Sequence, residues 1–142
     1  MTTFKDIGED LFIGSQPAQQ DIAEAKRVGI RTVIDLRMPA ETGTPNADMV
    51  ENHGLTYVNV PVDKSALSQQ HIVDLDRAMG RTQGPYLLHC ATGARAALLL
   101  SLSRAKQHGW TAERTFDEAE AMGFALRETT DFANFVRQVA AK

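Results

Sequence analysis

Short apolar runs alternate with helical patterns along this chain up to residue 90. The apolar runs cover residues 11–13, 31–37, 55–62 and 86–89. The stretches between them place apolar residues at helical spacing, and helical patterns dominate after residue 90. Strands that alternate with helices are typical of a parallel sheet covered by helices. The sequence therefore predicts an α/β sandwich with a mostly parallel central sheet flanked by helices.

Capping residues and breakers mark where the helices are expected to begin and end. Ser15 is the expected N-cap of the first helix, with Pro17 early in that helix and Gly29 at its end. Ser68 and Thr111 are expected to begin two later helices. A short helix is expected over residues 47–52, and a last helix from about residue 130. The helix after the cysteine is apolar nearly all round, so it should be buried.

Composition limits the possible functions. The 142 residues fit a single domain over 1–142, and 43% hydrophobic with 23% charged residues predict a folded core. A net charge of −3 argues against nucleic-acid or membrane-surface binding. No apolar stretch is long enough to span a bilayer, and no signal peptide is visible. The single cysteine cannot form an internal disulfide, so a cytoplasmic location is expected.

The only cysteine ends the apolar run at residues 86–89, and a glycine loop, an arginine and a helix-forming run follow it. A helix N-terminus, a nest of backbone N–H groups and a fixed cation lower a thiol pKa and bind an anion. Cys90 is therefore the expected nucleophile, and Arg95 is expected to grip the anion in a bidentate way. The competing interpretation is an inert buried cysteine. The expected anion cup consists of the N–H groups of Ala91, Thr92, Gly93, Ala94 and Arg95.

The loop His-Cys-x-x-Gly-x-Arg resembles the phosphate-binding loop of protein tyrosine and dual-specificity phosphatases. The chain is more similar to a bacterial phosphatase-like family that includes the amino-terminal domain of beta-lactamase hydrolase-like proteins, whose members are described as sulfurtransferases or as phosphatases. The resemblance runs from residue 11 to about residue 102 and implies a phosphatase-like α/β fold. Its landmarks are Ile13-Gly14-Ser15-Gln16-Pro17, Val33-Ile34-Asp35-Leu36-Arg37 with Glu41, Tyr57-Val58-Asn59-Val60-Pro61-Val62, and residues 89–95.

Two departures bear on the reaction. The phosphatase signature has five residues between cysteine and arginine, whereas this chain has four, as in the loop of rhodanese-type sulfurtransferases. Phosphatases also usually carry a hydroxyl directly after the arginine, where this chain has Ala96; Thr92 and Ser101 are the candidates to replace it. Phosphate-ester hydrolysis needs a general acid for the leaving group. By resemblance, Asp63 occupies its place, although a solvated loop aspartate is an equally good interpretation.

Sulfur transfer needs no such acid, because sulfite leaves readily. The sequence analysis therefore favours a rhodanese-like sulfurtransferase. Cys90 would accept a sulfane sulfur from thiosulfate or a persulfide and pass it to a thiol such as glutathione. The alternative is a tyrosine or dual-specificity-type phosphatase that acts on a phosphate ester through a phosphocysteine. An inactive anion-binding module is the third hypothesis.

Four further residues are expected to support the site. His89 is expected to steady the loop. Arg37 and Glu41 follow a strand end, where they either pair with each other or bind substrate, and the pair is favoured. Gln16 either reaches the site or forms a turn. The remaining histidines show no ligand spacing, so neither a metal nor another cofactor is expected.

Overall fold

Five strands form one sheet in the order β1-β2-β5-β3-β4 in the computed structural model, which describes residues 4–41 and 46–141 apart from the Glu41 side chain. The β1–β2 pair is antiparallel, and the other three pairs are parallel. This arrangement confirms the predicted fold class. The strands are β1 (Phe4–Gly8), β2 (Leu11–Gly14), β3 (Thr32–Asp35), β4 (Thr56–Asn59) and β5 (Tyr86–His89).

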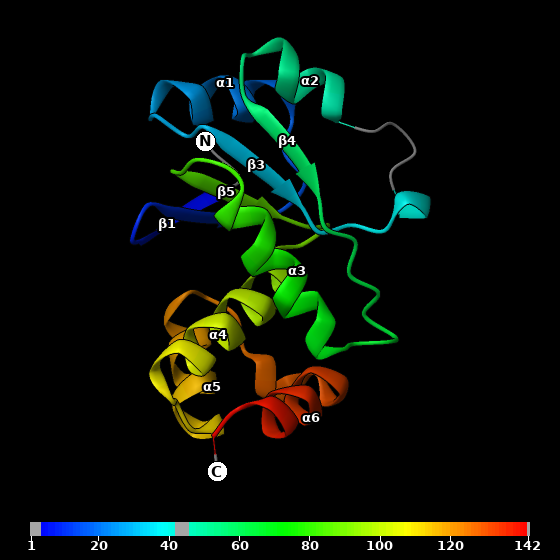
Figure 1. Ribbon diagram of the computed structural model, residues 1–142, viewed down its shortest axis with the longest axis vertical. Helices are drawn as coiled ribbons and strands as arrows, with labels where there is room; N and C mark the ends of the chain where they lie inside the picture. The colour runs from blue at the N-terminus through cyan, green and yellow to red at the C-terminus, as the bar shows by residue number, and fades with distance from the viewer. Residues whose placement is uncertain (1–3, 42–45, 142) are drawn as a thin grey trace.

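Helices cover both faces of the sheet (Figure 1). Helices α1 and α2 lie on one face, and α3 to α6 lie on the other. A small apolar cluster joins Ile22 of α1 and Val50 of α2 to Val33 and Leu87 of the sheet. A larger cluster fills the opposite face. The helices are α1 (Gln19–Arg27), α2 (Ala47–Asn52), α3 (Gln69–Gly80), α4 (Ala94–His108), α5 (Ala112–Ala121) and α6 (Thr130–Val139), with 3₁₀ turns at Pro39–Glu41 and Leu126–Glu128.

Strand register aligns the carboxyl ends of three neighbouring strands. Gly14 pairs with His89, and His89 pairs on its other side with Asp35. These three residues end β2, β5 and β3, so the segments that follow them leave the sheet at one edge. In parallel sheets this edge is where ligand sites form.

Helix α4 is the central helix of the larger layer. It packs against α3, α5 and α6, and its leucines Leu98, Leu99, Leu100 and Leu102 are buried, as their distribution around the helix predicts. Full burial of a leucine side chain stabilises the fold by roughly 1.5–3 kcal/mol. The layer therefore holds the N-terminus of α4 in a fixed position beside the sheet edge.

The first helix begins later than its sequence suggests. Its N-cap is Ala18 rather than Ser15, and the Asp21 carboxylate accepts a hydrogen bond from the Ala18 N–H at 2.7 Å. The residue before a proline avoids helical conformation, so Pro17 delays the helix. The expected caps of α3 and α5 are confirmed, because Ser68 Oγ accepts from Gln70 N at 3.0 Å and Thr111 Oγ1 from Arg114 N at 3.1 Å.

Strand β1 is absent from the sequence prediction. Its residues are half-buried or exposed, and the short FKDIG run has no clear apolar alternation. It exists because it pairs with β2 across a tight hairpin at the sheet edge. Within the described parts of the chain, no helix combines the length and the apolar character needed to cross a bilayer.

Candidate functional site

Cys90 directly follows β5, at the sheet edge where Gly14, His89 and Asp35 end their strands. Its side chain is almost fully buried, with 1% exposed. Backbone hydrogen bonds hold the segment from both sides. Leu36 N donates to His89 O at 2.8 Å, and Gln16 N donates to Ala91 O at 3.4 Å. The neighbouring strands therefore determine where the sulfur lies.

The loop after Cys90 closes back on the sulfur. Gly93 N–H donates to Cys90 Sγ at 3.1 Å, and α4 begins at the next residue. Gly93 has φ +95°, a conformation that favours glycine. A Cβ at this position would lie 2.8 Å from Phe124 Cζ and 3.3 Å from Gly14 O. Only glycine fits here without displacing its neighbours.

Arg95 lies in the first turn of α4 and is 4% exposed. Its Nη1 donates to the Val62 carbonyl oxygen at 3.0 Å. That bond connects the cysteine loop to the segment after β4, which also contains Asp63. The guanidinium is therefore held beside the loop, where an anion would meet it.

Asp63 is held in its charged form. Ser65 donates to Asp63 Oδ1 through its N–H at 2.9 Å and through its hydroxyl at 2.6 Å. These two hydrogen bonds lower the pKa of Asp63, and the positive charge of Arg95 lowers it further. A general acid must carry a proton, so Asp63 could act as one only when a bound anion opposes these effects.

A pocket of about 400 Å³ opens over the cysteine loop. Ala91, Thr92, Ala94 and Arg95, four of the five residues expected to form the anion cup, belong to its lining. The other lining residues were not expected from the sequence, and they are Lys64, Ser65, Thr129, Asp131 and Phe132. Lys64 and Ser65 follow Asp63 directly, so that part could have been inferred. The last three belong to the start of α6, and no sequence pattern connects them to the cysteine.

The four remaining supporting residues occupy different positions. His89 and Arg37 are buried beneath the loop, whereas the Gln16 side chain is exposed and contributes only its backbone N–H to the loop. Arg37 donates from Nε and Nη2 to the two carboxylate oxygens of Asp35, both at 2.9 Å. The expected pairing of Arg37 with Glu41 lies outside the described residues, because the Glu41 side chain is not described.

Asp35 is the centre of a buried polar network that the sequence analysis did not identify. The Tyr57 hydroxyl also donates to it, at 2.8 Å. Burial acts to raise the pKa of Asp35, but the hydrogen bonds from Arg37, together with that from Tyr57, outweigh it, so that the pKa is lowered. Asp35 therefore stays charged beneath the loop.

His89 is neutral in this network. Burial lowers its pKa to about 4, and the Asp35 charge opposes that effect only partly. Asn46 Nδ2 lies 3.2 Å from His89 Nε2. An amide nitrogen only donates, so Nε2 accepts and the ring proton is on Nδ1. Nδ1 in turn lies 3.9 Å from Asp35 Oδ1, beyond hydrogen-bond distance. His89 thus supports the loop rather than exchanging protons with substrate.

The two hydroxyls considered as replacements for the missing one after Arg95 differ in position. Thr92 Oγ1 accepts from Ala94 N at 3.3 Å, within the loop. Ser101 is seven residues further along α4 than Ala94, which corresponds to about 10 Å of helix. Ser101 therefore does not reach the cysteine. Within 4–41 and 46–141, no cluster of three histidine, cysteine or acidic side chains is suited to a metal.

Comparison with known proteins gives a consistent result. The family model described as "Beta-lactamase hydrolase-like protein, phosphatase-like domain" matches residues 3–107. A beta-lactamase hydrolase-like protein of Xylella fastidiosa is 33% identical over 125 residues, which cover 84% of this chain and 28% of that protein. The chain thus spans less than a third of the length of this relative.

Solved structures show the same fold. A candidate phosphatase from Neisseria meningitidis superimposes with a TM-score of 0.80 at 24% identity, over 96% of this chain and 97% of its own. A cysteine-to-serine variant of TpbA from P. aeruginosa, in complex with phosphotyrosine, has a TM-score of 0.75 at 15% identity, over 96% and 88%. The predicted phosphatase-like fold is confirmed.

The expected rhodanese-like sulfurtransferase activity is wrong. The matched family is phosphatase-like, and none of these relatives supports thiosulfate, persulfide or glutathione as a partner. That expectation rested on the four-residue spacing between Cys90 and Arg95. The shorter loop still turns Gly93 N–H toward Cys90 and places Arg95 beside it. Loop length by itself therefore does not distinguish sulfur from phosphorus chemistry.

Proposed function

Because the chain belongs to the family of phosphatase-like domains found in beta-lactamase hydrolase-like proteins, we propose that it hydrolyses phosphate monoesters through Cys90. The observation that carries the proposal is the 3.1 Å contact between Gly93 N–H and Cys90 Sγ, at the N-terminus of a buried helix. This arrangement stabilises negative charge on the sulfur and on an anion bound next to it.

The reaction proceeds in two steps. The Cys90 thiolate attacks phosphorus, an S–P bond forms, and the P–O bond breaks with its electron pair going to the leaving oxygen, which then takes a proton from water. Water then attacks the phosphocysteine, the S–P bond breaks, and inorganic phosphate and the thiolate are released. The loop N–H groups and the Arg95 guanidinium offset the charge on the phosphoryl oxygens. Gly93 N–H stabilises the leaving thiolate. Position 96, where phosphatases usually carry a hydroxyl for this purpose, is an alanine and cannot donate a hydrogen bond.

The substrate class follows from the pocket. Phe132 contributes an apolar side chain to the lining, and Lys64 contributes a cation. Asp63 is held ionised, so leaving groups that need little protonation are favoured. Aryl phosphates have such leaving groups, and the TpbA neighbour binds phosphotyrosine. The proposed substrate is therefore a small aryl phosphate or a phosphotyrosine side chain. Both the single catalytic domain and the cytoplasmic location stay predictions.

The test uses p-nitrophenyl phosphate with wild type, Cys90→Ser and Arg95→Lys. Wild type should release phosphate and, after acid quenching, carry a phosphoryl group on Cys90. Cys90→Ser should do neither, and Arg95→Lys should lose most of kcat/KM because lysine cannot make the bidentate contact. Hydrolysis that survives in Cys90→Ser would overturn the proposal. Orthovanadate binding without any turnover would identify an inactive anion-binding module instead.

A further inference from the structure

A second pocket lies at the opposite end of the sheet from Cys90. It has a volume of about 700 Å³ and includes Thr32 and Thr56, the first residues of β3 and β4. Cys90 follows the far end of β5, and a four-residue strand is about 13 Å long. A ligand in this pocket therefore does not touch the phosphatase site.

Three cationic side chains, Lys26, Arg31 and Arg81, line this pocket, and no carboxylate does. None of the three has an ion pair within the part of the chain that the structure describes. Other arginines, such as Arg127, face carboxylates. An unpaired basic cluster is notable in a chain whose net charge is −3.

Helix dipoles explain only part of this charge. Helices α1, α2 and α3 end near the pocket, at Arg27, Asn52 and Gly80. Each helix C-terminus carries about −0.5 of an elementary charge. Three of them offset about half of the three positive charges, so the pocket keeps a net positive charge. The three cations can therefore attract an anion as well as offset the negative ends of the helix dipoles.

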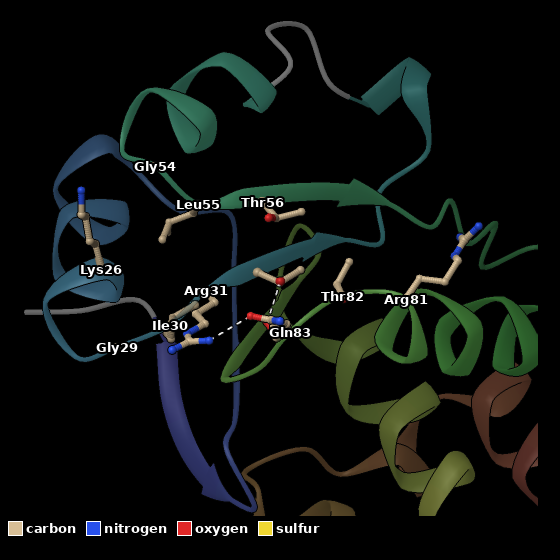
Figure 2. Close-up of a pocket in the computed structure, with 11 residues that line it drawn as sticks. Lys26, Gly29, Ile30, Arg31, Gly54, Leu55, Thr56, Arg81, Thr82 and Gln83 are labelled. Atoms are coloured by element: carbon tan, nitrogen blue, oxygen red, sulfur yellow. Dashed lines mark hydrogen bonds between the residues drawn. The ribbon is translucent and has the colours of Figure 1, made fainter.

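Arg31 is already oriented toward the pocket (Figure 2). Its Nη1 donates to Gln83 Oε1 at 2.9 Å, and the Gln83 carbonyl oxygen accepts from Thr32 Oγ1 at 2.7 Å. The Gln83 side chain orients the exposed guanidinium, and among residues 4–41 and 46–141 its other N–H groups have no partner. A guanidinium held in this way loses less entropy when it binds an anion.

The two other cations stand at opposite ends of the pocket, as Figure 2 shows. A Cβ on Gly54 would lie 3.4 Å from Lys26 Nζ, so the ammonium lies close to the Gly54 backbone. One small anion cannot contact both ends. Ile30 and Leu55 are buried and form an apolar part of the pocket lining.

We propose that this pocket binds an elongated small molecule carrying at least two phosphate groups, and that Arg31 is its main contact. The ligand spans the cluster, with one phosphate on Arg31 and another toward Lys26 or Arg81. Threonine hydroxyls along the strand ends supply neutral hydrogen bonds. The site is separate from the proposed phosphatase activity and does not depend on it.

The test is an NMR titration with inorganic triphosphate, in which backbone amides report each site. The Gly29, Gly54 and Thr56 signals should shift saturably, independently of the Gly93 signal at the catalytic loop. Arg31→Gln should weaken binding at this pocket about tenfold, because it removes a charge-assisted contact. Arg114→Gln is the matched control, since Arg114 is exposed on α5 and pairs with Glu118.

Three outcomes would overturn the proposal. The first is that only the Gly93 signal and its neighbours shift, which places triphosphate in the catalytic loop alone. The second is equal affinity for wild type and Arg31→Gln, which means general charge attraction. The third is citrate binding at this pocket as tightly as triphosphate, which removes the preference for phosphate. Backbone amide signals of Arg31→Gln that match those of wild type away from the pocket would confirm that the variant is folded.

Discussion

Asn46 donates its side-chain amide to His89 Nε2 at 3.2 Å, directly beneath the loop that contains Cys90. The same Asn46 side chain accepts from Arg37 Nη2 at 3.2 Å. One asparagine thus links the histidine before Cys90 to the buried Arg37–Asp35 ion pair. Through these contacts the loop rests on a polar network that is largely buried, with Arg37 1%, His89 0% and Asn46 6% exposed.

Replacing Asn46 with leucine should destabilise the fold by about 1–3 kcal/mol, because it leaves the buried His89 Nε2 without the Asn46 amide and removes one acceptor from Arg37 Nη2, which keeps its bond to Asp35. Urea unfolding measures this loss. Asn46 is the N-cap of α2 but makes no side-chain capping bond, so the effect is not that of a lost cap. Asn52→Leu, at an exposed position of α2, should change stability by less than about 0.5 kcal/mol. Equal losses in the two variants would argue against the network.

Gly93→Ala should destabilise the protein more than Gly29→Ala does. Both glycines have nearly the same positive φ, +95° and +96°. A Cβ on Gly93 meets Phe124 and Gly14, whereas one on Gly29 meets nothing within 4 Å. Overpacking should add about 1–3 kcal/mol to the loss at Gly93. Thermal unfolding of the two variants gives the difference directly, and an aryl phosphate assay should show lost activity for Gly93→Ala alone.

The buried His89 makes stability depend on pH. Its pKa falls from 6.5 to about 4 on folding, chiefly because of burial. Between these values the unfolded chain binds more protons than the folded one, so stability is full above pH 6.5 and falls as the pH drops toward 4. The loss attributable to His89 should reach about 3 kcal/mol.

The variant His89→Gln isolates this contribution, because glutamine can still accept from Asn46 and does not titrate. Urea unfolding at pH 7 and pH 4.5 should show a smaller loss for this variant than for wild type. His108→Gln changes an exposed histidine beside Trp110 and should follow the wild-type curve. If His89→Gln lost as much free energy of unfolding between pH 7 and pH 4.5 as wild type does, the pH dependence would belong to other groups.

Substrates with different leaving groups can show whether Asp63 or Asp131 protonates the departing oxygen. If Asp63 protonates the departing oxygen, Asp63→Asn should lower kcat for an alkyl phosphate by about 10²-fold or more and hardly affect p-nitrophenyl phosphate. Asp131→Asn provides the comparison, because Asp131 lines the same pocket from α6. A selective loss of alkyl phosphate turnover in Asp131→Asn alone would assign the acid to α6.

Local patterns were sufficient for much of this protein. Apolar runs and capping residues predict β2 to β5, the buried helix α4 and the start of α6, because these features depend on neighbours a few residues apart. The same holds for Cys90, Gly93 and Arg95, which lie on one strand–loop–helix segment. The order of the landmarks along the chain was enough to indicate the family.

Other features depend on contacts between residues distant in sequence, so only the tertiary structure decides them. Strand register places Asp35 beside His89, 54 residues apart, and packing of α6 brings Phe132 to the cysteine loop. The Ser65 hydrogen bonds that keep Asp63 charged depend on the conformation of its loop. Spacing along the chain predicts a loop suited to an anion. Which side chains surround that anion, and in which protonation state, is determined by the elements that pack around it.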